Sequence, residues 1–145
     1  MTTLQPPRRD SPTPATPIPR VVRRVRILVI DDEPVIGTVL RRVFKGGSHD
    51  VTVVQGGRQA LALIDAGAEF DVIFCDVVMP DLMGTQVYEA LRAHHPRLAD
   101  RFVFITGGAL EESARRVLAS AGATVLHKPF DIGTVRDAVR RITGR

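Results

Sequence analysis

Charged and hydroxyl-bearing side chains stand at the ends of four short apolar runs in this 145-residue chain. They are Asp31, Asp32 and Glu33 after VRILVI, Asp76 in FDVIFCD, Thr106 in RFVFIT and Lys128 in ATVLHK. If the four runs are parallel strands, their carboxyl ends meet at one rim of a sheet, and open parallel sheets bind ligands at that rim. The spacing therefore predicts a site that combines two or three carboxylates with a hydroxyl and an ammonium group.

These residue types suit a phosphoryl group held on a divalent cation. Carboxylates gathered at one point raise each other's pKa unless a cation joins them. Mg²⁺ is bound through one or two carboxylates, keeps several waters and takes a phosphate oxygen. An ammonium group is a point charge that suits phosphate, and a threonine hydroxyl donates to a phosphoryl oxygen. Mg²⁺ is therefore the expected cofactor.

Asp76 is the predicted acceptor of that phosphoryl group. No serine, cysteine or histidine at the ends of these runs forms a nucleophile–base pair, and His127 alternates with Lys128 and is expected on the other face. An aspartate can attack phosphorus to form an acyl phosphate. Lys128 would neutralise charge on the transferring group. Because the chain has 18 arginines and only two lysines, a lysine at this position indicates that a compact ammonium group is required.

Apolar runs alternate with amphipathic segments along the chain. We expect strands at 25–30, 51–54, 70–76, 101–106 and 123–128. Apolar stripes at helical spacing lie within 34–44, 60–68, 87–91, 110–121 and 132–142, the last preceded by the candidate N-cap Asp131. Five strands that alternate with five helices predict an α/β fold whose parallel sheet is covered on both faces.

The positive charge of the chain is concentrated in an N-terminal arm. Residues 1–26 hold six arginines and one aspartate, whereas residues 27–145 have a net charge of −1. Six of the ten prolines fall within residues 6–19, and such a segment has little to bury. We expect residues 1–22 to be a disordered arm and residues 23–145 to be one domain. The arm is either a solvated leader or a weak electrostatic contact with an anionic partner.

Composition excludes several other classes. Hydrophobic residues make up 44% and charged residues 25% of the chain, which is ordinary for a globular domain. No run of 18 apolar residues predicts a membrane span, and no apolar stretch near the N-terminus predicts a signal peptide. Cys75 is the one cysteine, so neither an internal disulfide nor a cysteine-rich zinc site is expected. No aromatic residue lies among the arm's arginines to stack on bases. A cytoplasmic protein without specific nucleic-acid or membrane binding is predicted.

Four motifs carry a resemblance to a known family. They are ILVIDDEP (27–34), FDVIFCDVVMPDLMG (70–84), FITGG (104–108) and HKPF (127–130). Over about residues 24–143 the chain resembles a response-regulator receiver domain of two-component signalling, similar to chemotaxis receivers and to receivers of hybrid histidine kinases. The resemblance implies a flavodoxin-like, doubly wound, five-stranded parallel sheet in the order 2-1-3-4-5, with five helices.

The resemblance also implies roles for individual residues. Asp76 would take a phosphoryl group from a phosphohistidine on a histidine kinase or phosphotransfer protein. Thr106 would contact the phosphoryl group and shift when it arrives, and Lys128 would pair with it. The implied ligands of Mg²⁺ are Asp31, Asp32, Asp76 and the backbone carbonyl of Val78.

Three positions depart from the family pattern. Many members carry an aromatic residue three positions before the lysine, where this chain has Val125. The positions two after the acceptor and two after the threonine are often polar, and here they are Val78 and Gly108. An aromatic switch at position 125 is therefore not expected, and loss of phosphate from Asp76 is expected to be slow.

The resulting prediction is a single-domain response regulator that switches protein contacts and has no attached DNA-binding output domain. It is expected to catalyse only its own phosphotransfer and dephosphorylation, so it is not predicted to be an enzyme. Its downstream partner would bind the surface formed by residues 109–143, and the chain would be a monomer or a weak dimer. Arginines on that surface would either meet an acidic partner or simply be solvated; they are Arg115, Arg116, Arg136, Arg140 and Arg141.

Other interpretations stay open at this stage. Asp31 and Asp32 are also residues that cap a helix, and Thr106 is one that bonds to backbone at a strand end. A phosphatase of the haloacid dehalogenase type needs an aspartate two positions after its nucleophile, but Glu33 and Val78 stand there. A dinucleotide-binding module lacks its G-x-G-x-x-G turn. A scaffold that keeps the fold without phosphorylation is the remaining alternative, and the TGG turn also fits a receiver detached from a hybrid kinase.

Overall fold

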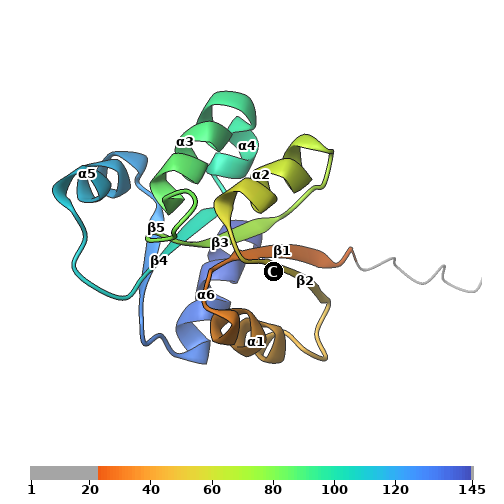
Figure 1. Ribbon diagram of the computed structural model, residues 1–145. Coiled ribbons are helices and arrows are strands. Elements are labelled where there is room, and N and C mark those ends of the chain that lie inside the picture. The colour runs from red at the N-terminus through yellow and green to blue at the C-terminus, as the bar shows by residue number, and fades with distance from the viewer. Residues whose placement is uncertain (1–22, 145) are drawn as a thin grey trace, which may run out of the picture.

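The computed structural model describes residues 23–144, so the predicted arm at residues 1–22 lies outside the described residues. Five parallel strands form one sheet in the order β2-β1-β3-β4-β5 (Figure 1). They are β1 (Val25–Ile30), β2 (His49–Val54), β3 (Val72–Asp76), β4 (Phe102–Thr106) and β5 (Thr124–His127). The expected α/β class and the flavodoxin-like strand order are confirmed.

Six helices accompany the sheet within residues 23–144, one more than predicted. They are α1 (Pro34–Val43), α2 (Gly57–Asp65), α3 (Gly84–His94), α4 (Pro96–Ala99), α5 (Glu112–Ala121) and α6 (Ile132–Thr143). The additional helix, α4, is a single turn that begins at Pro96. Proline suits a first helical position, since the N–H that it lacks has no partner inside the helix. The predicted stop of the preceding helix before Pro96 is correct.

Several element ends differ from those expected by one or two residues. β2 begins at His49 and β3 at Val72, and α5 begins at Glu112. The predicted cap of the last helix is confirmed, because the Asp131 carboxylate accepts a hydrogen bond from the Thr134 N–H at 2.7 Å. None of these differences moves the residue at which a strand reaches the rim.

The sheet is covered on both faces. α1 and α6 lie against one face, and α2, α3, α4 and α5 lie against the other (Figure 1). Alternate residues of β1 enter the two apolar cores, with Leu28 and Ile30 in one and Ile27 and Val29 in the other. Burial on both faces is why the central strands β1, β3 and β4 are almost continuously apolar. No helix within residues 23–144 is long and apolar enough to cross a membrane.

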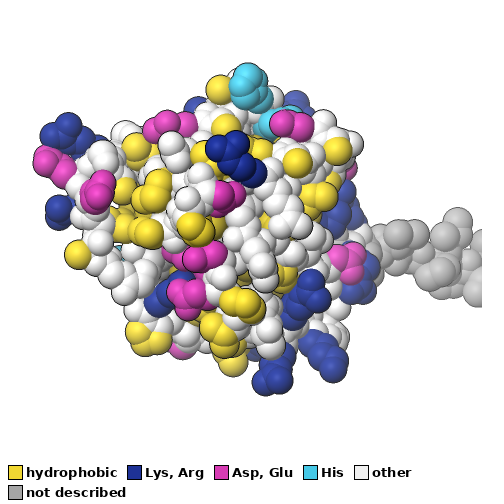
Figure 2. Space-filling model, viewed as in Figure 1, with side chains coloured by type: hydrophobic (Ala, Val, Ile, Leu, Met, Phe, Trp, Pro, Cys, Tyr) yellow, Lys and Arg dark blue, Asp and Glu magenta, His cyan; other side chains and the backbone are white. Residues whose placement is uncertain are grey.

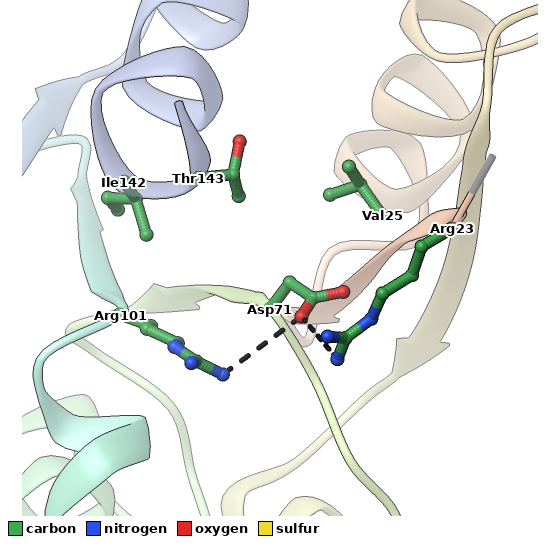
Figure 3. A pocket seen from close by; sticks show the side chains of 6 residues that line it. All are labelled: Arg23, Val25, Asp71, Arg101, Ile142 and Thr143. Carbon is green, nitrogen blue, oxygen red and sulfur yellow. Dashed lines mark ion pairs between the residues drawn. The ribbon is translucent and has the colours of Figure 1, made fainter. Parts of the chain in front are cut away.

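Asp71 joins the start of β3 to β1. It lies at the amino ends of the strands, opposite the carboxyl ends that carry the candidate site. Its carboxylate accepts the Arg26 N–H at 2.8 Å, and its own N–H donates to the Arg26 carbonyl at 2.7 Å. Arg23 and Arg101 approach the same carboxylate from opposite sides, at 3.5 and 4.0 Å (Figure 3). Partial burial raises the pKa of Asp71, but the hydrogen bonds from Arg26 outweigh it and leave the pKa below 3.8.

We expect Asp71→Ala to lower the free energy of unfolding by about 2 kcal/mol at pH 7, because a hydrogen-bonded charge is lost. The folded-state pKa lies below the unfolded value of 3.8. The contribution is therefore present above about pH 4 and is lost as the pH falls through the lowered pKa. Urea unfolding at pH 7 and at pH 3 should show the difference between the two proteins shrinking at pH 3. A difference that grows in acid would contradict this assignment.

Candidate functional site

Two neighbouring strands bring the predicted carboxylates together. Asp31 follows β1 and Asp76 ends β3, and these strands pair with Ile30 opposite Cys75. Asp31, Asp32 and Asp76 each offer a carboxylate oxygen, and these oxygens lie within 4.8 Å of one another. Asp31 is 1% and Asp76 6% exposed, whereas Asp32 is open to solvent. The site therefore combines two buried carboxylates, Asp31 and Asp76, with one exposed carboxylate, Asp32.

Lys128 reaches this cluster of carboxylates from the edge strand β5, which is separated from β3 by β4. It directly follows β5, and its Nζ lies 3.2 Å from Asp31 Oδ2, 3.5 Å from Asp76 Oδ2 and 3.1 Å from Glu33 Oε1. A Cβ at Gly107 would stand 3.2 Å from Lys128 Cδ, so a glycine at this turn lets the lysine side chain lie across β4. The predicted residues from β1, β3 and β5 are thus in direct contact.

The carboxylates are destabilised in their charged form. Burial, followed by the nearby charge of Asp31, raises the pKa of Asp76 to about 6. Burial also raises the pKa of Asp31. Partial burial lowers the pKa of Lys128, but its hydrogen bond with Glu33 and the charges of Asp31 and Asp76 outweigh it and leave the pKa above 10.5. The site holds more negative charge than one ammonium group neutralises.

The donor set fits a hard divalent cation. Asp31 Oδ1 accepts the Glu33 N–H at 2.9 Å, but the buried Asp31 Oδ2 has no hydrogen bond of ordinary geometry, and its contact is the ion pair with Lys128. An oxygen in that condition, beside two other carboxylates, is a suitable ligand for Mg²⁺. The Val78 N–H donates to Asp76 Oδ1 at 3.3 Å, so Val78 stands at the same rim. Its carbonyl remains a predicted ligand.

Thr106 ends β4 beside Asp76. Its neighbour Ile105 pairs with Asp76, and Thr106 is 3% exposed. The Thr106 hydroxyl donates to the Gly108 carbonyl at a long 3.5 Å, a bond that is easily exchanged for a better acceptor. An apolar groove opens from Thr106 toward α5 and β5, lined also by Gly108, Ala109, Leu110, Arg115, Leu118, Val125 and His127. Val125 is half-buried there, and His127 is exposed.

Sequence reasoning missed two contributors to the site. Glu33 shares Lys128 with the aspartates, although only its place after β1 was noted. Gly84 begins α3 so close to the acceptor that a Cβ there would collide with the Asp76 carbonyl oxygen. The Gly84 N–H donates to the Val77 carbonyl at 2.8 Å. Gly84 is the last residue of the motif FDVIFCDVVMPDLMG, and this close approach is the physical reason for a glycine there.

The surface around the site is acidic. Figure 2 shows Asp and Glu side chains gathered near the centre of this face, beside the strand ends, while Lys and Arg side chains gather at its lower right, beside α1. A cation would approach the acidic part favourably, since charges of opposite sign attract at short range.

The family of response regulator receiver domains matches residues 27–140. The chain belongs to this family. Among solved structures, the receiver domain of the Francisella response regulator 1452 is 27% identical, with a TM-score of 0.70, and the match covers 84% of this chain and 98% of that one. The chemotaxis protein CheY4 of Vibrio cholerae is 26% identical, with a TM-score of 0.69, over 82% and 98% of the two chains.

Curated relatives of this receiver domain are longer proteins. The chain is 30% identical over 124 residues to the transcriptional regulatory protein TcrA of Mycobacterium tuberculosis, covering 86% of this chain and 48% of that protein. It is 29% identical over 117 residues to the sensor kinase CckA of Brucella abortus, covering 80% of this chain and 12% of that protein. The receiver domain thus spans about half of one relative and about an eighth of the other. Receiver domains interact with histidine kinases and downstream partners and serve signalling rather than classical catalysis.

Proposed function

We propose that this receiver domain accepts a phosphoryl group onto Asp76 from a phosphohistidine of a histidine kinase or phosphotransfer protein. The observation that carries the proposal is the contact of Lys128 with acids from two strands, at 3.2 Å to Asp31 and 3.5 Å to Asp76. A buried acid cluster with one ammonium group and a buried hydroxyl, that of Thr106, has the charges that phosphoryl transfer needs.

In the proposed reaction an Asp76 carboxylate oxygen attacks phosphorus. The new bond is an acyl phosphate, the P–N bond to the donor imidazole breaks, and its electron pair returns to the imidazole nitrogen, which takes up a proton. With a pKa of about 6, Asp76 is chiefly ionised at neutral pH. Lys128 is placed to neutralise charge on the transferring group, and Thr106 to donate a hydrogen bond to it.

Asp31, Asp32, Asp76 and the Val78 carbonyl would hold Mg²⁺. When bound, the cation would supply positive charge to the phosphoryl oxygens and offset the repulsion among the carboxylates. The buried Asp31 Oδ2, which lacks an ordinary hydrogen bond, supports this assignment.

The signal is proposed to leave through the surface formed by α5, β5 and α6. A Thr106 hydroxyl that exchanges the Gly108 carbonyl for a phosphoryl oxygen would bias the β4–α5 loop between two arrangements. The groove lined by Thr106, Leu118 and Val125 would connect that loop to the proposed partner surface. Because position 125 is a valine, an aromatic switch there is not part of the mechanism.

Residues 23–145 would form a receiver domain that works in the cytoplasm, as a monomer or weak dimer. It would turn over no small-molecule substrate and would read no nucleic-acid sequence.

Intact mass after incubation with acetyl phosphate and Mg²⁺ tests the proposal. One added phosphate is expected on the wild-type protein and none on Asp76→Asn, whose side chain is nearly isosteric but is not a nucleophile. No addition after removal of Mg²⁺ by chelation is the second expected result. Phosphate that survives Asp76→Asn would place the acceptor elsewhere, and a wild-type protein that takes none would favour the scaffold alternative.

The acyl phosphate is expected to be lost slowly. Val78 and Gly108 present no polar side chain that could orient an attacking water, and the Val78 side chain is exposed beside Asp76. Following the phosphorylated mass over time should give a lifetime of many minutes, and Val78→Asn should shorten it. A half-life of seconds in the wild-type protein would be incompatible with this explanation.

A further inference from the structure

The loop that follows the acceptor contacts the first turn of α2. This acceptor loop, residues 77–83, joins Asp76 to α3. Its Asp81 accepts the Gly57 N–H on Oδ1 at 3.3 Å and the Arg58 N–H on Oδ2 at 3.1 Å. α2 has Gly56 as its N-cap residue and receives no cap from it. Asp81 therefore caps this helix from 24 residues further along the chain, and satisfies two N–H groups that have no partner inside the helix.

Two glycines make this contact possible. The Gly56 backbone, at φ −156°, is extended and suits any residue, but a Cβ there would stand 2.6 Å from Asp81 Oδ2. A Cβ at Gly57 would stand 2.9 Å from Leu82 Cβ and 2.6 Å from Val87 Cγ2. The sequence alone marks Gly56-Gly57 only as a turn. In the structure, the missing Cβ atoms of these two glycines let the acceptor loop pack against the start of α2.

The same loop orients the acceptor at its other end. The Val77 N–H donates to the Ile105 carbonyl at 3.0 Å, and the Val78 N–H donates to Asp76 Oδ1 at 3.3 Å. Met79 is 4% exposed in the core. Beyond it the loop is exposed at Asp81, and there the contact with α2 holds it. Only three positions separate this contact from the Val78 N–H that contacts the Asp76 carboxylate.

We propose that Asp81 is a positioning residue for phosphoryl transfer to Asp76, which it aids by holding the acceptor loop against the N-terminus of α2. The proposal rests on the proposed function of Asp76. The positive end of a helix favours a carboxylate, and the hydrogen bond from the Arg58 N–H, the largest of several backbone contributions, lowers the pKa of Asp81. The Asp81 carboxylate, which forms the tether between the acceptor loop and α2, is therefore charged throughout the neutral pH range.

The first test compares Asp81→Ala with Asp71→Ala. Both variants remove an aspartate that accepts backbone N–H groups, but Asp71 lies at the opposite edge of the sheet. Rates of phosphorylation by acetyl phosphate are measured over a range of Mg²⁺ concentrations, together with each Tm. Asp81→Ala is expected to lower the rate at saturating Mg²⁺ roughly tenfold or more, since small misplacements of reacting groups are costly. Asp71→Ala should lower the Tm and keep the wild-type rate.

Asp81→Asn keeps one acceptor oxygen and should give an intermediate rate. This variant also serves if Asp81→Ala folds poorly. A wild-type rate for both Asp81 variants would overturn the proposal. So would rates that simply follow Tm in all three variants, because Asp81 would then matter only for stability.

A second test uses Gly56→Ala. In the otherwise unchanged chain the new Cβ displaces the Asp81 carboxylate and should slow phosphorylation as Asp81→Ala does. In the Asp81→Ala background the same change should add almost nothing, because the side chain it collides with is gone. Losses that multiply in the double variant would show that the two residues act independently and would contradict the tether.

Hydrogen exchange separates failure of the tether from failure of the proposed function. In Asp81→Ala the amides of Gly57, Arg58 and the non-proline residues of the acceptor loop are expected to exchange faster. If the wild-type protein takes no phosphate, the proposed function fails, and exchange alone decides whether Asp81 holds the loop. Unchanged exchange at these amides would overturn the tether even where Asp76 is phosphorylated normally.

Discussion

Lys128→Ala is expected to lower the rate of phosphorylation of Asp76 by roughly 10²–10³-fold, the loss typical of removing one preorganised donor to a developing charge. Nζ of Lys128 is within 3.5 Å of Asp31, Glu33 and Asp76, so it is the cation placed to meet the transferring group. Lys128→Arg is expected to recover only part of the rate. An arginine carries the same charge on a larger planar group, and the lysine stem already lies close against Gly107.

Lys128→Ala should also bind Mg²⁺ more tightly than the wild-type protein, because the ammonium group no longer neutralises the carboxylates that would hold the cation. Rates with acetyl phosphate and Mg²⁺ titrations measure the two effects. Lys45→Ala is a matched control, since Lys45 is the other lysine of the chain and is exposed just after α1. Equal phosphorylation of Lys128→Ala and wild type would remove Lys128 from the mechanism, and weaker Mg²⁺ binding would contradict the electrostatic argument.

Gly84→Ala is expected to lower the free energy of unfolding by about 3 kcal/mol, the upper part of the usual range for overpacking. A Cβ at this position would collide with the Asp76 carbonyl oxygen and stand 3.0 Å from the Val77 Cα. Both neighbours are backbone atoms of the segment that carries the acceptor. The strain therefore moves either α3 or Asp76, and phosphorylation should fall along with stability.

Urea unfolding and the acetyl phosphate rate measure this prediction. Gly133→Ala is a suitable control, because Gly133 lies in the first turn of α6 and a Cβ there meets only the Asp131 side chain, at 3.3 Å. We expect that control to stay close to wild type in both assays. A Gly84→Ala protein as stable as wild type would show that the start of α3 can move away from the acceptor without cost.

Much of the site could be predicted from sequence because it lies at the ends of strands. VRILVI and FDVIFCD are apolar on both faces, which is typical of central parallel strands, and the residue that follows such a strand stands at the carboxyl rim. Adjacent placement of Asp31 and Asp76 follows once β1 and β3 pair. The strand order came from the family resemblance, since the pattern of apolar residues does not state which strands are neighbours.

Boundaries and the short helix were less predictable. Pro96 predicts the end of a helix, which is correct for α3, but the same residue also begins α4. A proline restricts the residue before it and suits the first turn after it, so one sequence position supports both outcomes. Packing of Leu98 and Ala99 against the core decides that a helical turn forms.

The types of the side chains at the candidate site and the rim on which they stand were determined by the amino-acid sequence alone, because local apolar patterning sets where each strand ends. Only the tertiary structure decided how those groups share charge and what holds them. Glu33 joins Lys128 across 95 residues, and Asp81 caps α2 across 24. Such contacts depend on the length of the side chains and on the missing Cβ atoms of Gly56, Gly84 and Gly107. The pattern of apolar residues does not predict them, because these segments meet only after the chain has folded.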